Sequence, residues 1–244
     1  MTGSSWRSLF LIAMVGAIAV LPTASASAST AFECAPVGSG AGFSDAHCRT
    51  ASIGAGYKHQ AIGGTQAIEA TDWNTSGETT AGTSSVLKTV LSGVSVEISC
   101  LATSASGSFE NTETGGEMVA AGTATVAYSF CKVSQPAGKG CSTPELVEFG
   151  VAGTTLGLGK AVKLTPAAGA EQFVGLQISG CSIKALNNTY PVKGSVIATA
   201  TGATLSTNEI GVTEAGTLTV GGQKAGLTGS LTVSTPVGSA LALT

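Results

Sequence analysis

Charged side chains are scarce in this chain. Only 10% of its 244 residues are Asp, Glu, Lys or Arg, against roughly 25% in an ordinary soluble domain. Neither sign of charge is clustered. Because a nucleic-acid-binding surface needs clustered Lys and Arg to release counterions from phosphates, we expect no nucleic acid partner. The hydrophobic fraction of 43% excludes a disordered chain, which combines low hydrophobicity with high net charge.

The residues that carry catalysis or bind metals are also few. Histidine occurs twice, as His47 and His59, and no G-x-S-x-G nucleophile elbow is present. The spacings typical of zinc sites, C-x₂₋₄-C and H-x₃₋₅-H, are absent as well. We therefore predict no catalytic residues, no metal and no cofactor. If the protein were instead a secreted hydrolase, Asp45, His47 and His59 would be its candidate residues.

Long apolar runs are missing except at the N-terminus. One run extends from Leu9 to Leu21 after the positive Arg7, and small residues follow it as far as Ala28. This is the pattern of a secretory signal peptide, and it is too short to span a bilayer, which takes about 20 apolar residues. We expect a signal peptide over residues 1–28, cleaved near Ala26 or Ala28, and no membrane span after cleavage. The mature protein would be secreted and extracellular, either free or associated with the cell wall.

Cysteine is present in an even number. Six cysteines in an exported chain predict three disulfides, with fifteen possible pairings. We favour Cys34–Cys48 and Cys131–Cys141, which close short loops, together with Cys100–Cys181, which would connect two alternating strands and enclose most of the chain.

Alternation of apolar and polar residues dominates the rest of the sequence and predicts half-buried strands. The Gly221-Gly222 pair predicts a two-residue hairpin loop. Five runs show the alternation, and their expected inward-facing residues are Val94, Val96, Ile98 and Cys100; Val126, Tyr128 and Phe130; Val147, Phe149 and Val151; Val174, Leu176 and Ile178; and Leu227, Leu231 and Val233.

Short strands with one apolar face predict an all-β fold with antiparallel sheets, reinforced by disulfides. The pattern fits a β-sandwich and a barrel equally well. Cleavage near Ala28 leaves 216 residues (244 − 28), which one β domain can absorb. We therefore predict a single exported domain over residues 29–244. Within it, residues 29–64 would form an irregular, Cys-containing N-terminal strap and residues 65–244 the β body.

Four short strings are similar to a family of uncharacterised exported proteins from soil-dwelling Gram-positive bacteria, which are rich in Thr, Gly and Ser. These strings are Gly56–His59, Leu91–Val94, Pro136–Cys141 and Ala185–Val192. The resemblance implies secretion and a shared β scaffold, and it brings no activity, ligand or site residues.

Scaffold signals without a catalytic motif favour a non-enzymatic exported or cell-envelope β-domain protein with a structural or recognition role. Its Thr/Ser-lined faces would suit a cell-wall glycan or a second copy of the chain as partner. Two alternatives stay open. One is the secreted hydrolase using Asp45, His47 and His59, and the other is a carrier of a small apolar ligand in a β cavity.

Overall fold

The computed structural model describes residues 30–38, 40–45, 48, 50–54, 56–71, 85–156, 160–201, 204–208, 217–235 and 241–243. The expected signal peptide and His47 lie outside these residues. Within them the chain is built from antiparallel β-strands and one short 3₁₀ turn, η1 (Lys184–Leu186). No helix in this part of the chain is long and apolar enough to cross a membrane. The predicted all-β fold is confirmed.

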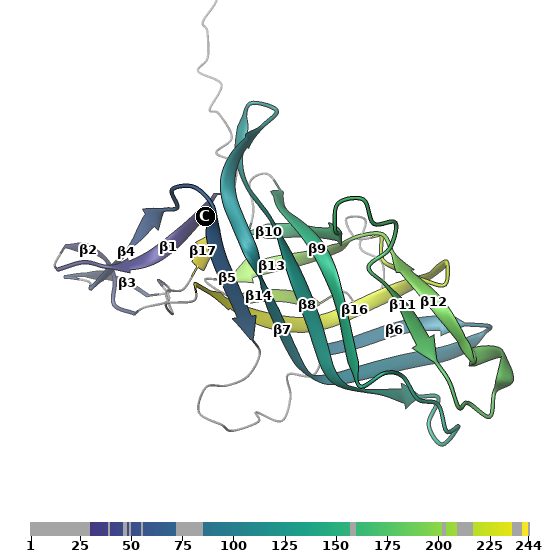
Figure 1. Cartoon of the computed structure of the whole chain (residues 1–244). Coiled ribbons are helices and arrows are strands. Elements are labelled where there is room, and N and C mark those ends of the chain that lie inside the picture. Colours follow the sequence, from purple (N-terminus) through teal and green to yellow (C-terminus); the bar gives the residue numbers. More distant parts are fainter. Residues whose placement is uncertain are drawn as a thin grey trace, which may run out of the picture.

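The body of the protein is a sheet that closes on itself (Figure 1). Hydrogen-bonded neighbours run in the order β16, β14, β13, β10, β9, β8, β7 and β5, and β5 pairs in turn with β16. These strands, with β6, have the following bounds: β5 (Gln66–Thr71), β6 (Ser85–Leu91), β7 (Val94–Thr114), β8 (Glu117–Gln135), β9 (Leu146–Leu156), β10 (Ala161–Pro166), β13 (Val196–Thr201), β14 (Thr204–Asn208) and β16 (Gln223–Ser234).

The gap between β7 and β16 is filled by two strands placed end to end. β5 pairs with the later part of β7, from Ser104 to Phe109, and β6 pairs with its first part, from Val94 to Cys100. Both strands also pair with β16. The ring therefore has eight positions, seven single strands and one shared by β5 and β6. Of the two predicted architectures, the structure adopts the barrel.

A small sheet covers one end of this barrel. It consists of β11 (Val174–Ile178), β12 (Asn188–Lys193) and β15 (Thr219–Val220), and it joins the barrel through the pairing of β15 with β16. We call these three strands the cap. The predicted Gly221-Gly222 hairpin makes the junction. The side chains of Ile178, Leu186 and Val220 are buried in the same apolar core as the barrel strands, so the cap and the barrel share one core.

The N-terminal segment lies at the opposite end (Figure 1) and forms a sheet of its own. Asn111 of β7 ties this sheet to the barrel, because its side-chain amide donates to the carbonyl O of Ala31 and accepts from the Ala31 N–H, both at 3.0 Å. The sheet has five strands in the order β17, β1, β4, β2 and β3: β17 (Leu241–Leu243), β1 (Ala31–Pro36), β4 (Tyr57–Ala61), β2 (Ala41–Phe43) and β3 (Ala51–Ile53).

The prediction of an irregular strap over residues 29–64 is wrong, because β1, β2, β3 and β4 of this sheet lie within these residues. The strands of this segment are only three to six residues long, so no run is long enough to show a clear period. One partner, β17, comes from the other end of the chain, and a local pattern does not predict such a pairing.

A paired irregularity in β7 and β8 exchanges the inner and outer faces of both strands. Cys100 and Cys131 oppose each other. Three residues away, after Cys100 in β7 and before Cys131 in β8, Thr103 opposes Tyr128. All four side chains belong to the inner face. An even alternation would repeat every two residues. Phe130, between the two pairs, has a φ of 55°, a left-handed conformation that is unfavourable for a bulky residue.

Phe130 is 55% exposed on the outer wall, so its predicted inward orientation is wrong. The prediction extends the alternation through the irregularity, where the two faces of the strand exchange. The other predicted inward-facing residues, given above, are buried or pack against the buried residues of the two apolar clusters of the body.

Two glycines allow β7 and β8 to approach closely above the irregularity. A Cβ at Gly107 would overlap the carbonyl O of Thr123, and a Cβ at Gly122 would overlap the carbonyl O of Ser108. Neither neighbour is a flexible side-chain end, so the backbone itself would have to move.

We expect Gly122→Ala to destabilise the protein by about 1–3 kcal/mol, the usual effect of overpacking. Urea unfolding measures the change. Gly63→Ala is the control, because no atom lies within 4 Å of a Cβ at Gly63. Equal stabilities of the two variants would contradict the close approach.

Candidate functional site

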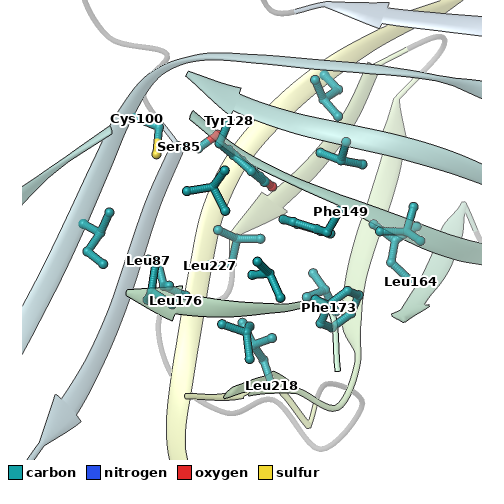
Figure 2. Close-up of a pocket in the computed structure, with 18 residues that line it drawn as sticks. Ser85, Leu87, Cys100, Tyr128, Phe149, Leu164, Phe173, Leu176, Leu218 and Leu227 are labelled. Carbon is teal, nitrogen blue, oxygen red and sulfur yellow. The ribbon is translucent and has the colours of Figure 1, made fainter. Parts of the chain in front are cut away.

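The barrel contains a partly open pocket of about 120 Å³, which we call the cavity. Its lining comes from β6, β7, β8, β9, β10, β13 and β16 of the barrel wall, and from the cap and its flanking residues. Figure 2 shows these side chains converging on a common space. The cap contributes Val174, Leu176 and Val192, and Phe173 and Leu218 lie immediately beside its strands. The cavity therefore lies where the cap meets the open end of the barrel.

Three aromatic rings lie in one part of the lining. The rings of Tyr128 and Phe149 are stacked with centroids 5.9 Å apart, and Phe149 meets Phe173 edge to face at 5.7 Å. These separations are within the range of favourable aromatic pairs. Tyr128 and Phe149 come from the barrel and Phe173 from the segment that leads into β11, so the aromatic contact also connects the wall to the cap.

The lining offers almost no hydrogen-bonding capacity. Of the described residues that line it, only Ser85 and Tyr128 carry a hydroxyl group. The Ser85 hydroxyl bonds that of Thr103 at 2.8 Å, and both residues are buried. A hydroxyl that is already paired offers less to a polar ligand than an unpaired one does. The cavity is therefore suited to apolar molecules.

The cap is fastened to the barrel on two sides. On one side it continues into β16 through the Gly221-Gly222 hairpin. On the other, the disulfide Cys141–Cys181 connects the loop after β8 to the loop after β11. Beside it, Ser142 and Ser179 exchange two backbone hydrogen bonds of 2.8 and 2.9 Å. The second side is thus a local closure made by one covalent bond and a few hydrogen bonds.

Two of the three predicted disulfide pairings are wrong. The structure contains Cys34–Cys48, as predicted, but pairs Cys100 with Cys131 and Cys141 with Cys181 instead of Cys131 with Cys141 and Cys100 with Cys181. The sequence contains a signal for the Cys100–Cys131 pair. Cys100 lies fifteen residues before Gly115 and Cys131 fifteen residues after Gly116, so a two-residue turn at these glycines brings the two cysteines opposite each other.

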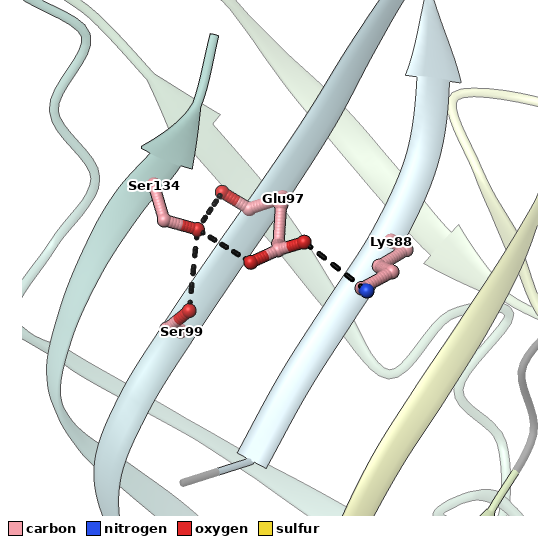
Figure 3. Close-up of polar contacts among 4 residues, drawn as sticks. All are labelled: Lys88, Glu97, Ser99 and Ser134. Carbon is pink, nitrogen blue, oxygen red and sulfur yellow. Dashed lines mark hydrogen bonds and ion pairs between the residues drawn. The ribbon is translucent and has the colours of Figure 1, made fainter. Parts of the chain in front are cut away.

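A polar network lies on the barrel wall outside the cavity (Figure 3). The Ser134 hydroxyl donates to the carboxylate of Glu97 at 2.9 Å and lies 3.2 Å from the hydroxyl of Ser99, and Glu97 also pairs with Lys88 at 3.2 Å. The pairing of β7 with β8 shifts by one residue here, and Ser134 is the extra residue. Histidine, the most frequent general base, is absent from these four residues, and the Glu97 carboxylate is already paired with Lys88. The network therefore supplies hydrogen-bond partners at the β-bulge that the extra residue creates.

Asp45 and His59 have separate local roles. The carboxylate of Asp45 accepts a hydrogen bond from the Thr50 N–H at 2.8 Å, within the turn that contains Cys48. His59 of β4 lies opposite Cys34 in β1, and its ring stacks on Phe32 and Phe43 with centroids 5.6 and 4.5 Å away. Its buried Nε2 has no hydrogen-bond partner within the described part of the chain. A general base must come within hydrogen-bond reach of the group that it deprotonates. The buried Nε2 of His59 is shielded from a substrate, so this arrangement does not support the hydrolase alternative.

No group of His, Cys, Asp and Glu within the described ranges is arranged to hold a metal ion. Comparison of the chain with protein-family models, with curated proteins and with solved structures finds no match. All six cysteines are disulfide-bonded, which is consistent with an oxidising compartment. The cavity is therefore the site from which a function can be argued.

Burial lowers the pKa of His59 below its ordinary value of 6.5, and the nearby positive charge of Lys160 adds to this effect. The unfolded chain then binds a proton more tightly than the folded chain does. The contribution of His59 to stability is complete above pH 6.5 and declines as the pH falls towards the folded pKa.

We expect His59→Phe to reduce the loss of stability between pH 7.5 and 5.5 relative to wild type. Phenylalanine fits between Phe32 and Phe43 and has no proton to bind. Urea unfolding at the two pH values measures the difference. An unchanged pH dependence in the variant would show that His59 is not the group responsible.

Proposed function

We propose that the protein is a non-enzymatic, exported binding protein that carries a small apolar ligand inside its barrel. The cavity under the cap is the observation that supports this proposal. An eight-stranded barrel has an interior just wide enough to be filled by side chains or to hold one small ligand. In this barrel the side chains do not fill it, and a space of about 120 Å³ is left.

An unfilled space of this size is unfavourable for a purely structural protein. Unfilled apolar space destabilises a fold relative to a filled core, because the side chains around it lose packing contacts. Two larger side chains would remove that loss without any change of fold. Retention of the space is therefore explained better by a molecule that occupies it than by a structural role alone.

The size and lining of the cavity define the ligand class. Apolar cavities of roughly 150 Å³ stay dry and accept benzene or xenon, whereas sites for drug-sized ligands take roughly 300–1,000 Å³. We propose a single aromatic ring or a compact branched hydrocarbon of similar size. The rings of Tyr128, Phe149 and Phe173 favour the aromatic case, because they offer both a face and an edge. With so few atoms to contact, the affinity would be in the micromolar to millimolar range.

Benzene is the probe for this proposal, and methyl NMR of Leu- and Val-labelled protein is the measurement. We expect saturable shifts for the methyl groups of Leu176, Val126 and Leu227, which line the cavity, and none for Leu101, which is 62% exposed on the outer wall. Val174→Phe should fill the space and abolish binding. Val90→Phe, the same change at a 49% exposed position outside the lining, should leave binding intact. Equal behaviour of the two variants, or no shifts in the wild type, would contradict the proposal.

The fastened side of the cap should control how fast the ligand exchanges. We expect Cys141→Ser/Cys181→Ser to increase the benzene exchange rate, because only the hydrogen bonds around Ser142 and Ser179 would still hold that side closed. The control is Cys34→Ser/Cys48→Ser, which removes the disulfide of the N-terminal sheet. NMR exchange spectroscopy measures both rates. Identical rates in the two double variants would show that the ligand leaves by another route.

A further inference from the structure

Three large apolar side chains are exposed next to one another on the outer wall of the barrel. Leu101 of β7, Phe130 of β8 and Leu146 of β9 are 62%, 55% and 55% exposed. Leu101 and Phe130 lie opposite each other at the irregularity of β7 and β8, and Ser129, next to Phe130, pairs with Leu146. We call these three residues the outer apolar patch. It is on the opposite face of the wall from the cavity.

The backbone conformation of Phe130 has a cost in free energy that burial of its ring within one molecule does not offset. A bulky residue at a φ of 55° is strained by on the order of 1–3 kcal/mol, and burial of the ring would ordinarily offset this. The ring is instead half exposed. Glycine would adopt the same φ without strain. A second surface that covers the ring would supply the burial that is missing in the single molecule.

The wall beneath the patch is rigid. The disulfide Cys100–Cys131 joins β7 and β8 at this level, so a partner would not have to order the patch before binding it. At this level β8 is paired with β7 on one side and with β9 on the other. A partner that covers Phe130 therefore has to bind through side chains.

We propose that the outer apolar patch is the centre of a two-fold symmetric interface with a second copy of this chain. The charges around the patch support a partner identical to itself. Lys132 lies beyond Phe130 at one end of the patch, and Glu148 lies beyond Leu146 at the other, opposite Ala127. Both are exposed, as is Glu145, which lies at the Lys132 end because its carbonyl O accepts from the Cys131 N–H. No ion pair within the described residues uses these three side chains.

A two-fold axis through the patch would bring Lys132 of each copy towards Glu148 of the other, because a symmetric interface brings one surface against itself in the reverse direction. Aromatic residues at the centre with charged residues at the rim are the usual composition of such interfaces. Three side chains form only the middle of an interface that normally buries roughly 800 Å² per partner, so we expect a weak, concentration-dependent dimer.

Sedimentation velocity from micromolar to millimolar concentration tests this proposal. We expect the wild type to shift from monomer to dimer as its concentration rises. Phe130→Gly should raise the dimer dissociation constant about 30-fold or more, as loss of a central aromatic residue does, and urea unfolding should show a fold at least as stable as wild type. Ile53→Ser is the control, because Ile53 is 98% exposed on β3, outside the patch, and should leave the dissociation constant unchanged.

Charge reversal then tests the two-fold arrangement. Lys132→Glu and Glu148→Lys should each weaken the dimer several-fold, and the double variant should restore it, because the reversed charges again face each other. A wild type that stays monomeric at millimolar concentration, including one that binds cell-wall glycan as a monomer, would overturn the proposal. So would a dimer that Phe130→Gly leaves intact, or a double variant weaker than both single ones. Since the patch lies outside the barrel, these results do not depend on whether the cavity binds benzene.

Discussion

Every strand of the closed barrel has to place its apolar side chains on a single face, because residues two apart share a side of the sheet. Closing the sheet turns that face inward all around the ring and leaves the other face in water. Closure also pairs the backbone groups of the wall with one another. A chain with only 10% charged residues can therefore present Thr, Ser and Gly to solvent without leaving long strand edges exposed.

The same constraint explains the irregularity at Leu101 and Phe130. β7 and β8 are 21 and 19 residues long and extend over most of the barrel wall, and both exchange their faces at this level. Both strands skip one residue of their alternation at the same level. The two strands therefore stay in register with each other, and the side chains of Cys100 and Thr103 both face inward. The consequence outside the barrel is that Leu101 and Phe130 are exposed side by side with Leu146. One local adjustment thus serves the packed interior and creates an apolar surface on the wall.

Much of the fold could be predicted from the sequence, since strand alternation is a local property. The inner faces of β9, β11 and β16, and of β7 as far as Cys100, follow from it directly. Pairings between distant segments do not, and for this reason β17 in the N-terminal sheet and the disulfide Cys141–Cys181 were not predicted. The sequence supports the cavity only as an alternative, because its existence depends on how well side chains from many strands fill the barrel interior. Phe173 and Leu218 precede their strands, where alternation gives no indication of direction.

The central claim is that the barrel interior is a dry, apolar space able to accept a small molecule. A crystal of the protein pressurised with xenon tests it most directly, because xenon enters apolar cavities of this size and its position is seen without assumptions about the natural ligand. We expect one ordered xenon atom between Phe149, Phe173 and Leu176. Electron density for hydrogen-bonded water in that space, or side chains that fill it, would contradict it.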